Sequence, residues 1–115
     1  IKRLADIVGP AFVAEIFYLG RQFNAQEALQ MGLINRMLPP GEVEQFVLNY
    51  ATTIAGNAPL TIAAVKRSIL EYVKDPAERN LALCQQMVDA CFASQDYIEG
   101  RRAFMEKRKP VWQGK

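Results

Sequence analysis

Apolar residues recur every three or four positions along most of the chain, which is the spacing of one face of an α-helix. The clearest case follows Gly41, where the apolar positions fall at i, i+3, i+4, i+7 and i+11 of a segment that Gly56 closes. This spacing predicts an amphipathic helix whose core face consists of Val43, Phe46, Val47, Tyr50 and Ile54.

Three more amphipathic helices are predicted after residue 56. Pro59 suits the first turn of a helix that continues to about residue 73. Asp75, Pro76 and Glu78 suit the cap, first and third positions of the next helix, which continues to about residue 91. Ser94 suits the cap of a last helix that continues to about residue 108. The second half of the chain is therefore predicted to be entirely helical.

The first forty residues contain shorter elements. Gly9 and Pro10 interrupt an apolar pattern over residues 1–19, which predicts two short helices. Asn24 and Glu27 have the spacing of a capping box for a helix over residues 25–31, and Gly32 suits its left-handed end. The apolar run over residues 33–38 is too short for a helix and is the single strand candidate. We therefore predict a mainly α fold with at most one short strand.

Composition is that of a globular chain. Of 115 residues, 50% are apolar, so the chain can bury a core, and we expect one compact unit. No apolar run approaches the ~20 residues that span a bilayer, so no membrane segment is expected. Ile1 already lies in a helix-like segment, which suggests a piece of a longer chain. The apolar stripes of the helices are wide, which favours burial of part of their surface by a partner.

The residue types argue against catalysis by this chain alone. Histidine is absent, and the two cysteines lack zinc-site spacing, so no metal site is predicted. Their separation of seven residues on one predicted helix is also too long for an easy disulfide. We expect the carboxylates to occupy caps and polar faces rather than a catalytic site; these residues are Asp6, Glu15, Glu71, Asp89, Glu99 and Glu106.

Positive charge is concentrated at the C-terminal end. Residues 1–100 carry eight Lys and Arg against eleven Asp and Glu, a balance of −3, whereas residues 101–115 carry six against one, a balance of +5. On a continuing helix Phe104 and Lys107 would share a face, where an aromatic ring and an ammonium could meet a nucleotide-bearing ligand. The simpler alternative is that these cations complement the helix C-terminus. Nucleic-acid binding fits less well, because no recognition motif accompanies the charge.

Two stretches of the chain resemble the crotonase family, the enoyl-CoA hydratases and isomerases. They are YLGRQFNAQEALQMGLINRMLP at residues 18–39 and SQDYIEGRRAFMEKRKPVWQGK at residues 94–115. Between them, IAGNAPLTIAAVKRSI at residues 54–69 is similar to the segment that links them in the family. The similarity covers essentially the whole chain, and the three pieces stand in the order of the family.

The resemblance implies a place for this chain within a larger fold. Family members have an N-terminal spiral of ββα turns and a C-terminal helical region that mediates trimer formation. Residues 1–40 would be the end of the spiral, and residues 41–115 would be the C-terminal helical region, where oligomers form. The oxyanion hole and the catalytic carboxylates of the family lie mostly upstream of these positions. We therefore expect no catalytic residue here and no activity from the isolated chain.

The resemblance also implies one binding contact. In related hydratases an aromatic residue and a lysine of the C-terminal motif reach the coenzyme A site of a neighbouring subunit, and the matching residues here are Phe104 and Lys107. Coenzyme A would be part of the acyl-CoA substrate, with no tightly bound cofactor and no metal. The parent would be a homo-oligomer, a trimer or dimer of trimers, that binds neither nucleic acid nor membrane and is cytoplasmic if bacterial.

Two questions stay open at this point. Hydratases, isomerases, thioester hydrolases and ring-forming enzymes share this C-terminal pattern, so the reaction subclass is undecided. The alternative function is a stand-alone helical module that binds another protein through an uncovered apolar stripe.

Overall fold

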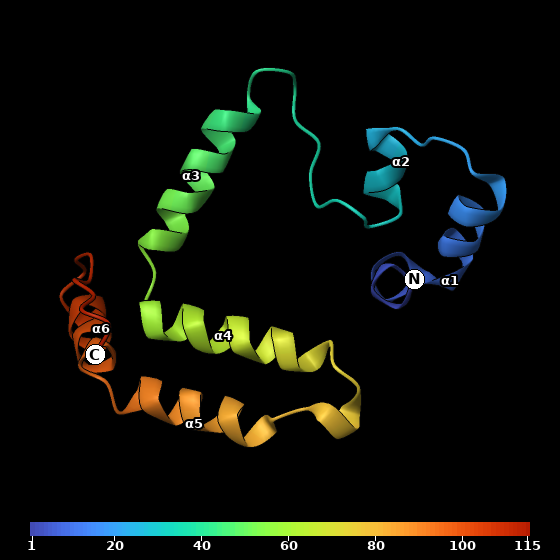
Figure 1. Ribbon diagram of the computed structural model, residues 1–115. Helices are drawn as coiled ribbons and strands as arrows, with labels where there is room; N and C mark the ends of the chain where they lie inside the picture. The colour runs from blue at the N-terminus through green and yellow to red at the C-terminus, as the bar shows by residue number, and fades with distance from the viewer. The chain divides into compact units, whose positions relative to one another are not determined.

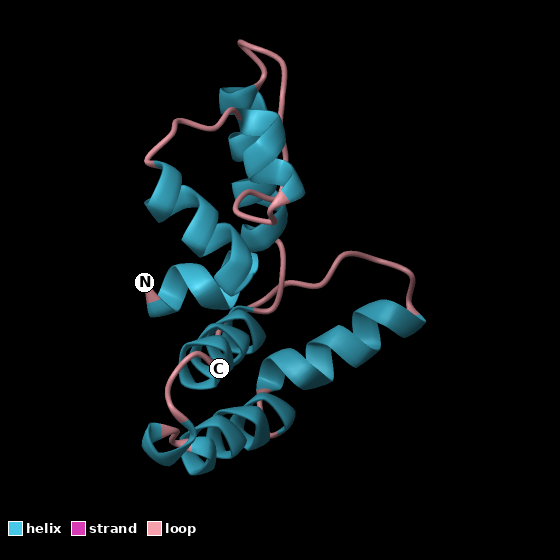
Figure 2. Cartoon of the chain, turned by 90° about the vertical axis from the view of Figure 1, so that its right-hand side faces the viewer, coloured by secondary structure: helices cyan, strands magenta, loops and turns pink.

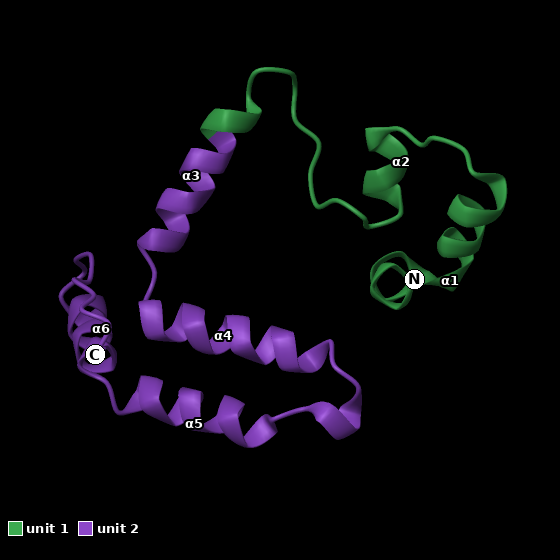
Figure 3. Ribbon diagram, viewed as in Figure 1, with its two compact units in different colours: residues 1–45 green, residues 46–115 purple.

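The computed structural model describes residues 1–115, and all its regular elements are helices (Figures 1 and 2). The prediction of a mainly α fold is confirmed. Contacts between backbone positions divide the chain into two compact units, Ile1–Gln45 and Phe46–Lys115, where the composition predicted one (Figure 3). The division into a spiral end (1–40) and a helical region (41–115) stays a prediction.

The first unit contains helices α1 (Lys2–Leu19) and α2 (Ala25–Gln30). Helix α1 breaks at Gly9, whose φ of 82° and ψ of 157° are not helical, so the predicted interruption is confirmed. Asn24 and Glu27 form the predicted capping box, with the Asn24 side chain accepting from the Glu27 N–H and the Glu27 carboxylate accepting from the Asn24 N–H, each at 2.9 Å.

The predicted strand over residues 33–38 does not form. The backbone N–H groups of Leu33 and Ile34 both donate to the Ala28 carbonyl of α2, at 2.9 and 3.4 Å, so they close the end of the helix. No strand is present in the chain to pair with this segment. The apolar side chain of Leu33 instead packs against the small core of this unit, which is formed by Val8, Val13 and Met31.

The second unit holds most of α3 (Val43–Ala55), followed by α4 (Pro59–Tyr72), a 3₁₀ turn η1 (Pro76–Glu78), α5 (Leu81–Phe92) and α6 (Gln95–Met105). Helices α4 and α5 lie side by side and run in opposite directions (Figure 1). The four predicted helices are therefore present. The last ends at Met105, short of the predicted end at residue 108.

Helix α5 begins later than its sequence pattern predicted. Pro76–Glu78 forms only a 3₁₀ turn, and Arg79 returns to extended backbone. The cap is Asn80, whose side-chain oxygen accepts from the Leu83 N–H at 2.9 Å. Asp75 is the N-cap of the 3₁₀ turn only, so the prediction that it caps the following α-helix was wrong; Asn80 supplies that cap after the chain has turned.

The predicted core face of α3 is not buried by this chain. No residue of α3 is buried, and Val43, Val47, Tyr50 and Ile54 are all substantially exposed. The helix itself forms as its period predicted. Within the second unit no element buries its apolar face, so the expected core face does not form there.

Candidate functional site

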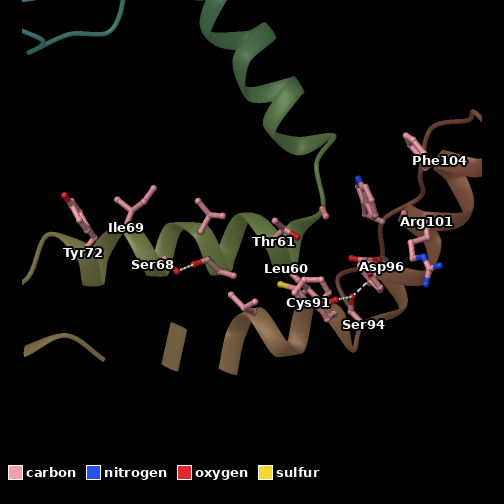
Figure 4. A pocket seen from close by; sticks show the side chains of 18 residues that line it. Leu60, Thr61, Ser68, Ile69, Tyr72, Cys91, Ser94, Asp96, Arg101 and Phe104 are labelled. Atoms are coloured by element: carbon pink, nitrogen blue, oxygen red, sulfur yellow. Dashed lines mark hydrogen bonds between the residues drawn. The ribbon is translucent and has the colours of Figure 1, made fainter. Parts of the chain in front are cut away.

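An apolar cavity of about 900 Å³ lies between α4, α5 and α6 (Figure 4). Most of its lining is aliphatic or aromatic, and its polar groups include Ser68, Asp96 and Arg101. The main apolar side chains are Val65, Ile69, Val88, Phe92, Tyr97 and Phe104. Such a cavity suits an apolar ligand or a packed side chain more than a reacting polar group.

Phe104 stands on the last turn of α6 at the edge of this cavity. It is labelled at the upper right of Figure 4, and 83% of the residue is exposed. An aromatic ring so open to solvent lacks the burial that would explain it as a core residue. It is free to stack on a planar ligand.

Lys107 lies beyond the end of α6, so the expected shared helical face with Phe104 is wrong. Its φ is +54°, a left-handed value, and it follows the C-cap residue Glu106. The Lys107 N–H donates to the Phe104 carbonyl at 3.2 Å, and the Arg108 N–H donates to the Ala103 carbonyl at 3.0 Å. This pair of bonds is a Schellman motif, which ends the helix and turns the chain. Phe104 and Lys107 are therefore joined through the backbone rather than aligned along one helix face.

Glu99 and Arg108 form an ion pair beside this turn. The Arg108 guanidinium meets the Glu99 carboxylate with two nitrogens, Nη2 donating to Oε2 at 3.0 Å and Nη1 donating to Oε1. The Val111 N–H also donates to Glu99 Oε1, at 2.9 Å. Arg108 chiefly, with help from Val111, lowers the pKa of Glu99 to about 2. Glu99 is thus a structural anion at neutral pH.

The C-terminal tail, residues 109–115, folds back along α6. Asp96 is 3% exposed, and its two carboxylate oxygens accept from the N–H groups of Gln113 and Gly114 at 2.7 and 2.8 Å. Trp112 Nε1 donates to the Gly56 carbonyl at 2.8 Å. A Cβ at Gly100 would lie 3.1 Å from the Trp112 ring, so this glycine permits the close approach. The local sequence pattern gives no sign of this contact, because the partners of Asp96 lie 17 and 18 residues further along the chain.

Glu71 is the least exposed large side chain of the chain, at 1%, and not the polar-face residue that the pattern predicted. Its carboxylate accepts from the Asn80 N–H at 2.8 Å and from Lys74 Nζ, and it pairs with Arg67. The Asn80 N–H, followed by Lys74, lowers the pKa of Glu71. The residue joins the end of α4 to the start of α5, since its partners lie on both.

The other singled-out carboxylates lie on exposed surfaces in local contacts. The partners are Lys2 for Asp6, Arg21 for Glu15, Gln85 for Asp89 and Arg108 for Glu106. Cys84 and Cys91 are partly buried free thiols. No cluster of three or more potential metal ligands occurs. None of the helices combines the length and apolar character that a membrane crossing requires.

The family model for enoyl-CoA hydratase/isomerase matches residues 1–115. This chain belongs to the enoyl-CoA hydratase/isomerase family. It is 35% identical to the carnitinyl-CoA dehydratase of Escherichia coli and 34% identical to that of Salmonella typhi, in each case over 100% of this chain and 46% of the relative.

Solved structures of the enoyl-CoA hydratase/isomerase family match the fold. The enoyl-CoA hydratase of Bacillus anthracis has a TM-score of 0.88 at 30% identity, covering 98% of this chain and 44% of that one. The enoyl-CoA hydratase of Mycobacterium tuberculosis has a TM-score of 0.84 at 32% identity, covering 98% and 45%. The chain thus spans a little under half the length of these relatives.

Proposed function

We propose that this chain is the C-terminal helical part of an enzyme that adds water across the double bond of a 2-enoyl-CoA, or shifts that bond. The observation that carries the proposal is the match of the enoyl-CoA hydratase/isomerase family model to all 115 residues. The substrate of the parent would be a CoA thioester, because the names of its relatives include both enoyl-CoA hydratase and carnitinyl-CoA dehydratase. Hydration and dehydration are the two directions of one reaction, so both names fit one chemistry.

The role proposed for this part is to hold coenzyme A. The exposed ring of Phe104 would stack on the adenine, and the Lys107 ammonium would pair with a phosphate. No ion pair or hydrogen bond occupies that ammonium in the chain. As in the resemblance above, the contact would be made in the site of a neighbouring subunit of a homo-oligomer, a trimer or a dimer of trimers.

The isolated chain would not catalyse the reaction. Acid–base catalysis needs a carboxylate or another titratable group free to exchange a proton with substrate. Asp96, the carboxylate at the apolar cavity, already accepts a backbone N–H on each oxygen. Glu71 and Glu99 are held by cations and backbone donors. These contacts support a structural role for all three.

The activity test compares the complete gene product with the 115-residue chain. Both are assayed for hydration of a short 2-enoyl-CoA and for dehydration of carnitinyl-CoA. We expect turnover by a product at least twice this length and none by the chain. Turnover by the chain, or a gene product of only this length that is inactive, would overturn the proposal.

The CoA contact has a separate test in the complete protein. Replacing Phe104→Ala removes the stacking ring and should raise KM for the enoyl-CoA about tenfold with kcat nearly unchanged. Met105→Ala is the matched control, because Met105 is the adjacent α6 residue and is similarly exposed. An equal effect of both substitutions, or none from Phe104→Ala, would reject the contact.

A stand-alone helical module that binds another protein is the second candidate. It is favoured by the open apolar cavity between α4, α5 and α6. The two functions differ in the length of the gene product. A gene product whose N-terminus lies near residue 1 and which has no hydratase activity would support the module instead.

A further inference from the structure

Lys107 has an unusual backbone conformation for its residue type. It is the only non-glycine residue of the chain with a positive φ. Glycine or asparagine normally occupies this position of a Schellman motif, because a Cβ makes the left-handed region unfavourable. A conformation of this kind persists only when the surrounding structure imposes it, and such residues are concentrated at ligand sites.

Side-chain contacts of the next residue hold the chain directly after this turn. Arg108 is held by the bidentate pair with Glu99 and by a bond to Glu106. The Val111 N–H donates to the same Glu99 carboxylate, so the chain is fixed on the far side of the turn as well. The backbone of Lys107 therefore lies between two fixed points. One is the end of α6, and the other is Arg108, which is paired with Glu99.

The two neighbouring cations have opposite environments. Arg108 is neutralised by two carboxylates, whereas the Lys107 ammonium has no anionic partner. The side chain of Glu99 is 19% exposed and that of Glu106 is 52% exposed, so Glu99 is the better shielded of the two acids. A shielded, bidentate pair fixes geometry more firmly than an exposed single contact.

We infer that Glu99 is a positioning residue for coenzyme A binding: through Arg108 it holds the backbone of Lys107 in the left-handed conformation and so directs the free ammonium toward a phosphate of the ligand. This inference rests on the proposed function of Lys107. It adds a residue that does not itself touch the ligand.

The test uses Glu99→Gln in the complete protein. The direction in which KM for the enoyl-CoA changes separates a positioning role from a simple effect of charge. Removing a nearby negative charge would by itself strengthen the attraction of a phosphate to Lys107. Loss of positioning predicts the reverse, a rise of about fivefold in KM for the enoyl-CoA with kcat within about twofold. Glu106→Gln is the matched control, because it removes the same charge from the other partner of Arg108, and its KM should fall or stay unchanged.

The double variant distinguishes a positioning role from a merely structural one. Lys107→Asn removes the ammonium while keeping a residue that tolerates the left-handed region. If Glu99 acts through Lys107, Glu99→Gln should add nothing to the KM of Lys107→Asn. Independent effects that multiply would overturn the inference, as would an unchanged or lower KM for Glu99→Gln alone.

The outcomes also separate this inference from the proposed function. If Lys107→Asn leaves KM unchanged, the CoA contact of Lys107 itself is wrong. If Lys107→Asn raises KM and Glu99→Gln does not, only the positioning role fails. Should Glu99→Gln not fold, Arg108→Lys answers the same question, because it keeps the charge but loses the bidentate geometry; it should raise KM in the same direction.

Discussion

At the scale of single residues, Glu71 shows how a charged side chain can become the most buried one. Arg67 of its own helix, Lys74 just beyond the end of that helix and the backbone N–H of Asn80 surround its carboxylate. The N–H comes from nine residues further along the chain, after the turn between α4 and α5. A buried carboxylate is tolerated only with such a full set of partners. Glu71 therefore stabilises the turn as well as its own helix.

Replacing Glu71→Gln should lower the thermal unfolding midpoint of the chain by roughly 5 °C, because charge-assisted bonds to Arg67 and Lys74 are lost and a buried amide needs new partners. Circular dichroism during heating measures the effect. Glu78→Gln is the control, since Glu78 is an exposed residue of η1. Equal midpoints for the two variants would mean that the Glu71 contacts do not support the fold.

Glu99 predicts an acid transition of the C-terminal tail. Its folded-state pKa of about 2 lies below the usual value of 4.5, so the unfolded chain takes up a proton first as the pH falls. The contribution of Glu99 to stability is complete above about pH 4.5 and is lost toward pH 2. Trp112, the only tryptophan, follows Val111 directly and reports the tail by its fluorescence.

The emission of Trp112 should stay constant from pH 7 to about 4.5 and change as the pH falls further. In Glu99→Gln the change in emission below about pH 4.5 should be smaller, because the glutamine side chain does not titrate. An identical acid profile in both proteins would show that the Glu99 contacts do not hold the tail.

At the scale of elements, the start of α5 separates a local signal from the structure that forms. The Asp75-Pro76-Glu78 pattern is correct for a helix start, yet it produces only the 3₁₀ turn. Asn80 caps α5 through its side chain. Its backbone N–H donates to Glu71, and this bond holds Asn80 next to the end of α4. Local sequence does not distinguish Asp75 from Asn80 as the cap of α5; the bond between Asn80 and Glu71 does.

Replacing Asn80→Ala should destabilise the chain by about 1 kcal/mol, since the Leu83 N–H loses its side-chain acceptor. Asn80→Ser should preserve most of the stability, because serine also caps well and the backbone N–H to Glu71 is kept. Urea unfolding followed by circular dichroism compares them. Equal losses for alanine and serine would exclude capping as the reason.

The helices that sequence could predict were those with signals inside the element. The capping box at Asn24 and Glu27 and the cap at Ser94 operate over three residues, and both are confirmed. The strand over residues 33–38 failed because a strand requires a partner elsewhere in the chain. The predicted end of α6 at residue 108 was wrong for a similar reason. The chain turns at Lys107, and the residue after this turn, Arg108, pairs with Glu99, nine residues earlier.

At the scale of the whole molecule, much of the apolar surface of these 115 residues is uncovered. The apolar face of α3 and the cavity between α4, α5 and α6 are both open to solvent. Exposed apolar surface of this kind is normally an interaction surface or promotes aggregation. The match of the chain to a little under half of its relatives' length fits this observation.

The 115-residue chain by itself should therefore bind a hydrophobic dye and associate as its concentration rises. Phe92→Lys, on the cavity, should reduce dye fluorescence and association, because it places a charge among apolar side chains. Gln86→Lys, a residue of α5 that does not line the cavity, is the control. Dye fluorescence and light scattering give the two readings, and no difference between the variants would mean that the cavity is not the surface involved.

The sequence by itself determined the helices, two of their caps and the family, because helix periodicity, capping and motif order are written in residues close together along the chain. Only the tertiary structure decided that Glu71 is buried, that Asn80 starts α5, that Asp96 holds the tail and that Lys107 is left-handed. Each of these depends on contacts beyond helical spacing, most of them with partners nine or more residues away, and packing selects such partners among many local possibilities.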